Sequence, residues 1–157
     1  MLFEIKLKLA NRLKGATVMT VKTLSISLET RGNADIQDIS QAVQEKVEQS
    51  GLNNGVVTLF TPSSTSGFTT IEYESGCISD LQRLFDEIAD PERYYEHEAR
   101  WHDGNGHSHV RAALLGASLS VPFVDGRLTL GTWQQIVFID FDVRPRRREL
   151  VVQMIGE

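Results

Sequence analysis

Two stretches near the end of the chain decide its fold class: "GTWQQIVFIDFDV" (Gly131–Val143) and "RELVVQMIG" (Arg148–Gly156). Both are mainly apolar, and the "RPRRR" segment between them is typical of a turn, so we expect two strands joined by that turn. Before them, "DG" at Asp125–Gly126 separates "SVPFV" from "RLTL", which is a strong signal of a tight β-hairpin. The last part of the chain is therefore predicted to be mainly β-sheet.

The first part of the chain combines strands with amphipathic helices. "VMTVKTLSISLET" (Val18–Thr30) alternates apolar and polar residues, which is the period of a half-buried strand. "VVTLF" (Val56–Phe60) and the β-branched "GFTTIEYE" (Gly67–Glu74) are also predicted strands. Apolar residues at spacings of three and four predict one helix that ends at Gly51 and another that ends before Pro91. The residues that define these two helical faces are Ile36, Ile39, Val43 and Val47, then Ile78, Leu81, Leu84, Phe85 and Ile88.

These elements predict a single compact α+β domain with a mostly antiparallel sheet and two main helices. "VRAALLGASLSV" (Val110–Val121) has a helical composition, but Gly116 and the alternation after it favour two short strands. The domain is expected to span residues 19–157. Residues 1–18 are expected to form an N-terminal extension, either an extra edge strand or an accessory arm.

The composition argues against several classes of protein. A formal net charge of −5 over 157 residues does not provide the basic footprint that general nucleic-acid binding needs. No apolar run approaches the ~20 residues of a membrane helix, and the first residues lack the apolar core of a signal peptide. The single cysteine, Cys77, cannot form an internal disulfide and suits a reducing compartment. We expect a cytoplasmic protein with neither a nucleic acid nor a membrane as its partner.

All four histidines are gathered in one short window: His97, His102, His107 and His109. If "HSHV" is extended, His107 and His109 share one face, where they can bind one metal ion or divide the roles of base and anion ligand. The competing interpretation is a hydrogen-bonded surface pair. The preceding "DGNG" (Asp103–Gly106) is a turn whose glycines let backbone amides approach a ligand closely.

Carboxylates are the usual third element of a site built from two imidazoles, because they balance the charge of a divalent ion. Glu72 and Glu74 in "TIEYE" would share one face of a strand, either as part of a site or as a solvated face. Asp103 is a further candidate, although an aspartate before glycine is first of all a turn residue. The "RPRRR" segment is interpreted as a solvated hairpin tip, with phosphate or nucleic-acid binding as the alternative.

Long stretches of the sequence also resemble a known family. "DGNGHSHVRAALLGASLSVPFVDGRLTLGTWQQIVFIDFD", followed by "RRRELVVQMIGE", closely resembles the C-terminal half of the YjbQ family, also called secondary thiamine-phosphate synthases. "GVVTLFTPSSTSGFTTIEYESG" and the helix after it agree with the same pattern. The resemblance runs from about Val21 to the C-terminus. It implies a compact α+β fold of the YjbQ type, assembled as a homotrimer with sites near the subunit contacts.

The resemblance also implies an activity. It is a weak thiamine-phosphate synthesis, in which a hydroxymethylpyrimidine diphosphate joins a thiazole phosphate and pyrophosphate is released. The polar residues that carry over by resemblance are His97, His109, Glu72, Glu74, Trp133 and Gln134. Many members of the family have a histidine after the proline of the "TP" loop, where this chain has Ser63. If that histidine is a ligand or a base, His107 is a candidate replacement.

Three functions are weighed from these residues. In a transferase, Glu72, His97, His109 and Asp103 would be catalytic, and the phosphorylated substrate would be bound by Arg111, Trp133, Gln134, Ser64 and Thr65. The alternative interpretations are a surface ion pair for Arg111 and core packing for Trp133. In a metal-dependent hydrolase of a phosphorylated small molecule, His97, His107, His109 and Glu74 would hold a divalent ion, Mg or Zn, that activates water. The third function is a non-catalytic trimer that binds an anion or small ligand.

Overall fold

The structure is a computed structural model that describes residues 18–157. The predicted N-terminal extension therefore lies outside the described residues, apart from Val18. Eight strands and four helices follow in this order: β1 (Thr20–Thr30), β2 (Asp35–Asp38), α2 (Ser40–Ser50), β3 (Gly55–Phe60), β4 (Ser66–Ile71), α3 (Ser75–Ile88), α4 (Glu96–Trp101), α5 (Gly106–Leu115), β5 (Ser118–Val124), β6 (Arg127–Leu128), β7 (Gln135–Asp140) and β8 (Arg146–Gly156).

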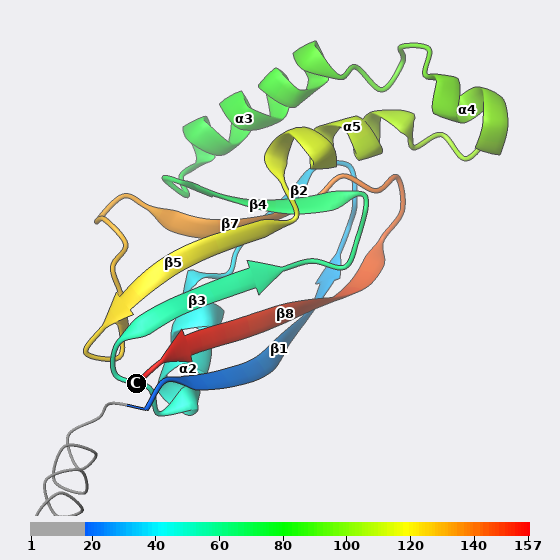
Figure 1. The fold of residues 1–157 in the computed structure, drawn as a ribbon. Coiled ribbons are helices and arrows are strands. Elements are labelled where there is room, and N and C mark those ends of the chain that lie inside the picture. Colours follow the sequence, from blue (N-terminus) through cyan, green and yellow to red (C-terminus); the bar gives the residue numbers. More distant parts are fainter. Residues whose placement is uncertain (1–17) are drawn as a thin grey trace, which may run out of the picture.

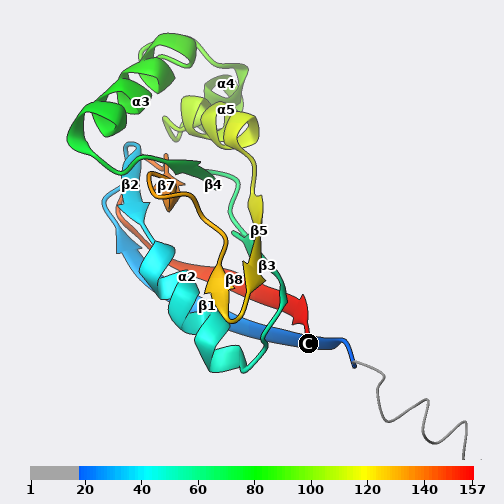
Figure 2. The same cartoon turned by 90° about the vertical axis from the view of Figure 1, so that its left-hand side faces the viewer.

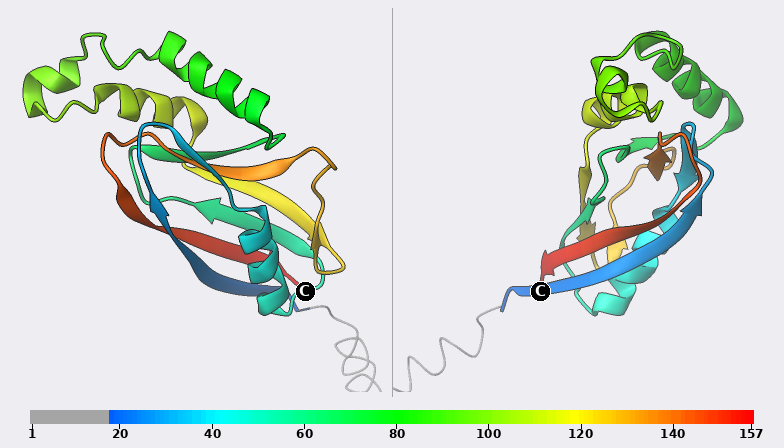
Figure 3. Two further views of the ribbon diagram at one scale, coloured as in Figure 1. Left: turned by 180° about the vertical axis from the view of Figure 1, so that it is seen from behind. Right: turned by 90° about the vertical axis from the view of Figure 1, so that its right-hand side faces the viewer.

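The strands form two sheets, in which every pairing is antiparallel. The larger sheet has the order β1-β8-β3-β5-β6, and the smaller sheet has the order β2-β7-β4. Helices α3 and α5 cover one side of the smaller sheet (Figure 1). Helix α2 lies across the back of the larger sheet, as the side and rear views show (Figures 2 and 3). The prediction of one α+β domain with mainly antiparallel strands is confirmed.

Strand β7 is the centre of the fold because both of its faces are buried. Ile136 and Phe138 point into the main core, which also receives Val43 and Val47 of α2 and the inner face of the larger sheet. The alternate residues, Val137 and Ile139, point into a second core with the helices α3 and α5. An apolar run without alternation is what a strand between two apolar layers requires.

The connection between β7 and β8 is not the predicted hairpin. The two strands belong to different sheets: β7 pairs with β2 and β4, whereas β8 pairs with β1 and β3. The segment that contains Arg144 therefore crosses from one sheet to the other, so it is a structural corner. The hairpin predicted at Asp125–Gly126 is confirmed, since both residues have the positive φ of a tight turn between β5 and β6.

Two helical predictions need correction. Ile36 lies in β2, so helix α2 starts later than the spacing suggested and uses Val43 and Val47 as its buried positions. The C-terminus at Gly51 is confirmed by its left-handed conformation, φ 71°. Of the two short strands predicted within Val110–Val121, the first is wrong because that segment belongs to helix α5, and the second is confirmed as the start of β5 at Ser118.

Helix α5 escaped prediction because its buried face is partly polar. The buried positions Ser108, Arg111 and Ala112 have helical spacing, but two of them are hydrophilic. Each polar group has a partner: Ser108 Oγ donates to the carbonyl of Phe141 at 2.5 Å, and Arg111 donates to the carbonyl of Ala89. The short helix α4 was also not predicted. Among the helices of residues 18–157, none is long and apolar enough to cross a membrane.

Candidate functional site

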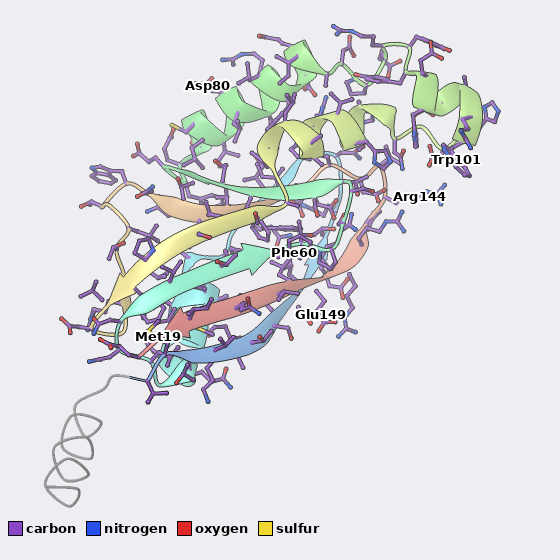
Figure 4. All side chains as sticks on the ribbon, viewed as in Figure 1. Met19, Phe60, Asp80, Trp101, Arg144 and Glu149 are labelled. Atoms are coloured by element: carbon purple, nitrogen blue, oxygen red, sulfur yellow. The ribbon has the colours of Figure 1, made fainter. Side chains whose placement is uncertain are left out.

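A pocket of about 620 Å³ opens where α4 and the start of α5 meet the β3–β4 loop and the β7–β8 corner. Figure 4 shows Trp101 of α4 and Arg144 of that corner at the same end of the molecule. The side chains that define the pocket chemically are those of Thr65, His97, His109, Arg146, Arg147 and Arg148. We call it the arginine–histidine pocket.

The imidazoles of His97 and His109 lie next to each other, with ring centroids 4.5 Å apart. His97 comes from α4 and His109 from α5, so the loop between the two helices decides their approach. Within that loop His102 adopts a left-handed conformation, and the carboxylate of Glu98 accepts hydrogen bonds from the backbone of Gly104 and Gly106, both at 2.6 Å. These contacts fold the glycine-rich turn back onto α4 and hold the two rings together.

Two buried polar atoms of this pocket have no hydrogen-bond partner among residues 18–157. One is Nε2 of His97, which lies 3.4 Å from Oδ1 of Asp103 without forming a hydrogen bond. The other is Oδ1 of Asn105, at the start of α5. Buried polar groups in folded proteins are nearly always paired, so these two atoms are an exception in the lining of the pocket.

The arginine side of the pocket is built on two buried carboxylates. Arg148 donates to both oxygens of Asp140 at 2.7 and 2.8 Å and to the hydroxyl of Thr65 at 3.0 Å. Nε of Arg146 donates to Asp142 at 2.9 Å. Burial by itself raises the pKa of Asp142, but hydrogen bonds from Arg146 and from the backbone of Arg144 outweigh it, so the pKa is lowered. The carboxylate of Asp142 therefore stays charged, and the hydrogen bonds to Asp140 and Asp142 hold the guanidinium groups in fixed positions.

A left-handed turn supports this corner from behind. Gly32, Asn33 and Ala34 all have positive φ, of 76°, 54° and 59°. The N–H of Asn33 donates to the carbonyl of Asp142 at 2.7 Å, and a Cβ on Gly32 would collide with that same carbonyl oxygen. The β1–β2 connection thereby fixes the backbone that carries the arginines.

The predicted acidic pair does not reach the arginine–histidine pocket. Glu72 and Glu74 lie beyond the end of β4 and do not share a strand face. Instead, the carboxylate of Glu74 caps α3 by accepting hydrogen bonds from the backbone of Gly76 and Cys77, which lower its pKa. Both glutamates line a different pocket of about 320 Å³, together with Trp133.

The two candidates His107 and Arg111 are turned into the protein. On a helix, residues two apart point to different sides, so His107 and His109 do not share a face as they would in a strand. The side chain of His107 packs near Tyr95 and is buried. Arg111 is 3% exposed and binds the carbonyl of Ala89 and the carboxylate of Asp86. It closes the end of α3 and is neither a surface ion pair nor placed to meet a phosphate in the pocket.

The other predicted site residues lie partly inside and partly outside the arginine–histidine pocket. Ser64 and Thr65 line the arginine–histidine pocket, as do Asp103 and Ser63. Trp133 is 71% exposed, which contradicts the core-packing interpretation, and Gln134 donates to the hydroxyl of Thr70 outside the pocket.

A resident metal ion does not fit the four side chains predicted to bind one. His97 and His109 are adjacent, but His107 is buried elsewhere and Glu74 caps a helix. Within residues 18–157 no three side chains of His, Cys, Asp or Glu are grouped so that they could hold a metal ion. The charge that the pocket offers to a ligand comes from its arginines.

The arginines of the corner are the residues that the sequence interpretation undervalued. It treated "RPRRR" as a solvated tip, whereas Arg148 is 15% exposed and part of a buried network. One signal was available: the alternating aspartates of "DFD" (Asp140–Asp142) lie in an apolar run, and buried carboxylates require cationic partners.

Comparison with known proteins agrees with this architecture. Residues 24–157 match the family model described as UPF0047 protein YjbQ-like. A UPF0047 protein of Methanothermobacter thermautotrophicus is 36% identical over 145 residues, covering 92% of this chain and 99% of the relative. The UPF0047 protein YugU of Bacillus subtilis is 35% identical over 138 residues, covering 87% of this chain and 99% of the relative.

Solved structures show the same fold. The crystal structure of a YbjQ-like protein of unknown function from Sulfolobus solfataricus has a TM-score of 0.84 and 32% identity, covering 89% of this chain and all of that one. An uncharacterized conserved protein of the YjbQ/UPF0047 family from Clostridium acetobutylicum has a TM-score of 0.76 and 30% identity, covering 83% of this chain and 98% of the other.

Proposed function

Since this chain belongs to the YjbQ-like UPF0047 family, we propose a function that fits both the family and the site. The protein is an enzyme that acts on a phosphorylated small molecule in the arginine–histidine pocket. The observation that carries the proposal is the conjunction of guanidinium groups and adjacent imidazoles around one opening. The finer expectation is a transferase that resembles the secondary thiamine-phosphate synthases.

Phosphate binding is supported by how the arginines are held. Arg146 uses one nitrogen to bind Asp142, which leaves the outer nitrogens of a fixed, planar donor group for an anion. Arg147 is 77% exposed and has only a 4.0 Å contact to Glu29. The hydroxyl of Ser64 on the facing loop supplies a neutral donor at the same opening, whereas the hydroxyl of Thr65 already donates to Asp142. Hydrogen bonds from a charged guanidinium group to a phosphate oxygen are stronger than hydrogen bonds between neutral groups.

The expected transfer needs charge neutralisation more than covalent help from the protein. The nitrogen of the thiazole would attack the methylene carbon of the pyrimidine, and the carbon–oxygen bond to pyrophosphate would break. The electron pair leaves with the pyrophosphate, whose growing negative charge the arginines stabilise. His109 or His97 would donate a proton to the departing oxygen, with Asp103 next to His97 as its partner.

One observation bears on a second candidate, an anion-binding protein without turnover. Among the described residues, none of the hydroxyls of Ser63, Ser64 and Thr65 is hydrogen-bonded to His97 or His109. A covalent mechanism through one of these hydroxyls would need such a base within reach, so the observation counts against that kind of turnover and leaves both direct transfer and anion binding open. Binding of phosphate compounds without product formation would favour this candidate.

The expected homotrimer is also a proposal, and the larger sheet supports it. Its face turned away from the core carries exposed apolar side chains, among them Val56 and Phe60 of β3 and Ile155 of β8. Phe60 is labelled in Figure 4. Val56 pairs with Ile155, so the apolar residues of neighbouring strands lie side by side. Exposed apolar side chains that are grouped on one face of a sheet are typical of a subunit contact.

The test of the function compares an arginine of the pocket with an arginine elsewhere. Purified protein is incubated with hydroxymethylpyrimidine diphosphate, thiazole phosphate and magnesium, and thiamine phosphate is measured. We expect Arg147→Gln to lower product formation at least tenfold, while Arg83→Gln on the exposed surface of α3 has no effect. Equal product from Arg147→Gln and the unaltered protein would refute a role of the pocket in this reaction.

A further inference from the structure

A second pocket of about 330 Å³ adjoins the arginine–histidine pocket and shares the side chains of Ser63, Ser64 and His109 with it. The remainder of its lining is uncharged and mostly very small: Ser66, Ala112, Ala113, Gly116 and Ala117. We call it the alanine pocket. The two pockets differ sharply in chemistry, because one is lined by three arginines and the other by alanines.

We propose that the alanine pocket is the specificity pocket of the site. It receives the uncharged organic portion of the phosphorylated ligand, and the side chain at position 113 sets how large that portion is. This inference rests on the proposed function, because it places the phosphate of the same ligand against Arg146 and Arg147. His109 lies at the junction, where the organic portion is joined to its phosphate.

The size of the alanine pocket suits one ring or a short aliphatic chain. A closed apolar cavity of about 150 Å³ is enough to hold benzene. The alanine pocket has about twice that space, but it is open on one side. Away from His109 at the junction, its lining offers no charged group, so a second charge on the organic portion would lose its hydration without gaining a partner.

Close packing of the backbone fixes the walls of the alanine pocket, so the side chains that line it determine its volume. A Cβ on Gly67 would collide with the carbonyl of Gly116 and touch the side chain of Leu115, so β4 and the end of α5 pack directly on each other. Ala112 is buried, whereas Ala113 lies on the exposed side of α5 at the rim. A longer side chain at position 113 can therefore be accommodated by the fold while it fills the pocket.

The polar side of the ligand has independent support. Nε2 of His97 and Oδ1 of Asn105 are the buried atoms without hydrogen-bond partners noted above, and both residues line the arginine–histidine pocket and not the alanine pocket. Of these two atoms, Nε2 of His97 can donate to an anion, whereas Oδ1 of Asn105 accepts and needs a donor such as water. A free donor beside the arginines on one side and a lining without arginines on the other match a ligand with one anionic end.

The experiment measures the dissociation constants of phenyl phosphate and inorganic phosphate by titration calorimetry, using the full-length protein. We expect unaltered protein to bind phenyl phosphate at least about tenfold more tightly, because the ring buries apolar surface. Ala113→Leu should reduce this ratio to about twofold or less and leave the affinity for inorganic phosphate unchanged. Ala99→Leu, on the exposed surface of α4, is the matched control and should keep the full ratio.

The outcomes separate this inference from the proposed function. If unaltered protein binds both compounds equally, or if Ala113→Leu keeps the tenfold ratio, the specificity pocket is refuted while phosphate binding stands. If neither compound binds, or if Arg147→Gln does not weaken inorganic phosphate, the proposed function is refuted and the inference with it. The unfolding midpoint of Ala113→Leu, expected to match that of Ala99→Leu, confirms that the variant is folded.

Discussion

Replacing Arg148 with methionine should strongly destabilise the protein, because it leaves a buried carboxylate without its cation. The side chain of Asp140 is fully buried, and Arg148 binds both of its oxygens. Breaking a buried ion pair by removing one partner costs about 3–5 kcal/mol of unfolding free energy. The hydroxyl of Thr30 and the N–H of Asp142 still donate to Asp140, so we expect a loss near the lower end of that range.

The assay is urea-induced unfolding followed by circular dichroism, with thermal unfolding in parallel. A loss of about 3 kcal/mol corresponds to a decrease in Tm of about 6–12 °C for a chain of this length. Arg147→Met is the matched control: Arg147 and Glu29 are both nearly four-fifths exposed, so the change should stay within about 0.5 kcal/mol. Asp140→Asn combined with Arg148→Met should recover part of the loss. A decrease below about 1 kcal/mol for Arg148→Met alone would refute the account of the corner.

Three further predictions follow from other contacts. Burial and the charge of Arg111 lower the pKa of His107, so the unfolded chain takes up a proton near pH 6.5 before the folded protein does. The free energy of unfolding should therefore fall as pH decreases from about 6.5 towards 5 in urea titrations, and His107→Gln should flatten that slope. Phe60→Glu should shift the mass measured by light scattering from a trimer towards a monomer, and an unchanged mass would exclude this sheet face as the contact. Gly32→Ala should lower Tm, because the new Cβ meets the carbonyl of Asp142 in a left-handed conformation, whereas Gly51→Ala meets no atom within 4 Å and should cost less.

The sequence predicted the strands well where apolar periodicity matched the real environment. Strands β1, β3 and β8 have one face on the core, and their alternation shows it. Helix α5 was not predicted because polar residues, Ser108 and Arg111, occupy buried positions on it. Their hydrogen-bond partners are backbone carbonyls that only the folded chain brings near. No pattern within a single segment contains that information.

The site was only partly predictable for the same reason. The clustering of histidines drew attention to the loop between α4 and α5, but the helix decides which rings meet. His107 is buried beside Tyr95, whereas His109, two residues further along α5, lies beside His97. Glu72 and Glu74 were assigned to the same site on their chemistry and on the family resemblance, and they lie at the other end of β4.

The charge of the whole chain is a poor guide to the charge of the pocket. The net value of −5 argues against a basic surface, yet three arginines line one opening. They are kept there by Asp140 and Asp142, whose negative charge is buried behind them and counts in the total without facing the pocket. An anion at the opening therefore meets the guanidinium groups first, at short range, while the carboxylates are already engaged by hydrogen bonds. The same aspartates that lower the net charge thus make the proposed anion site possible, because without them the arginines would repel one another and leave the corner.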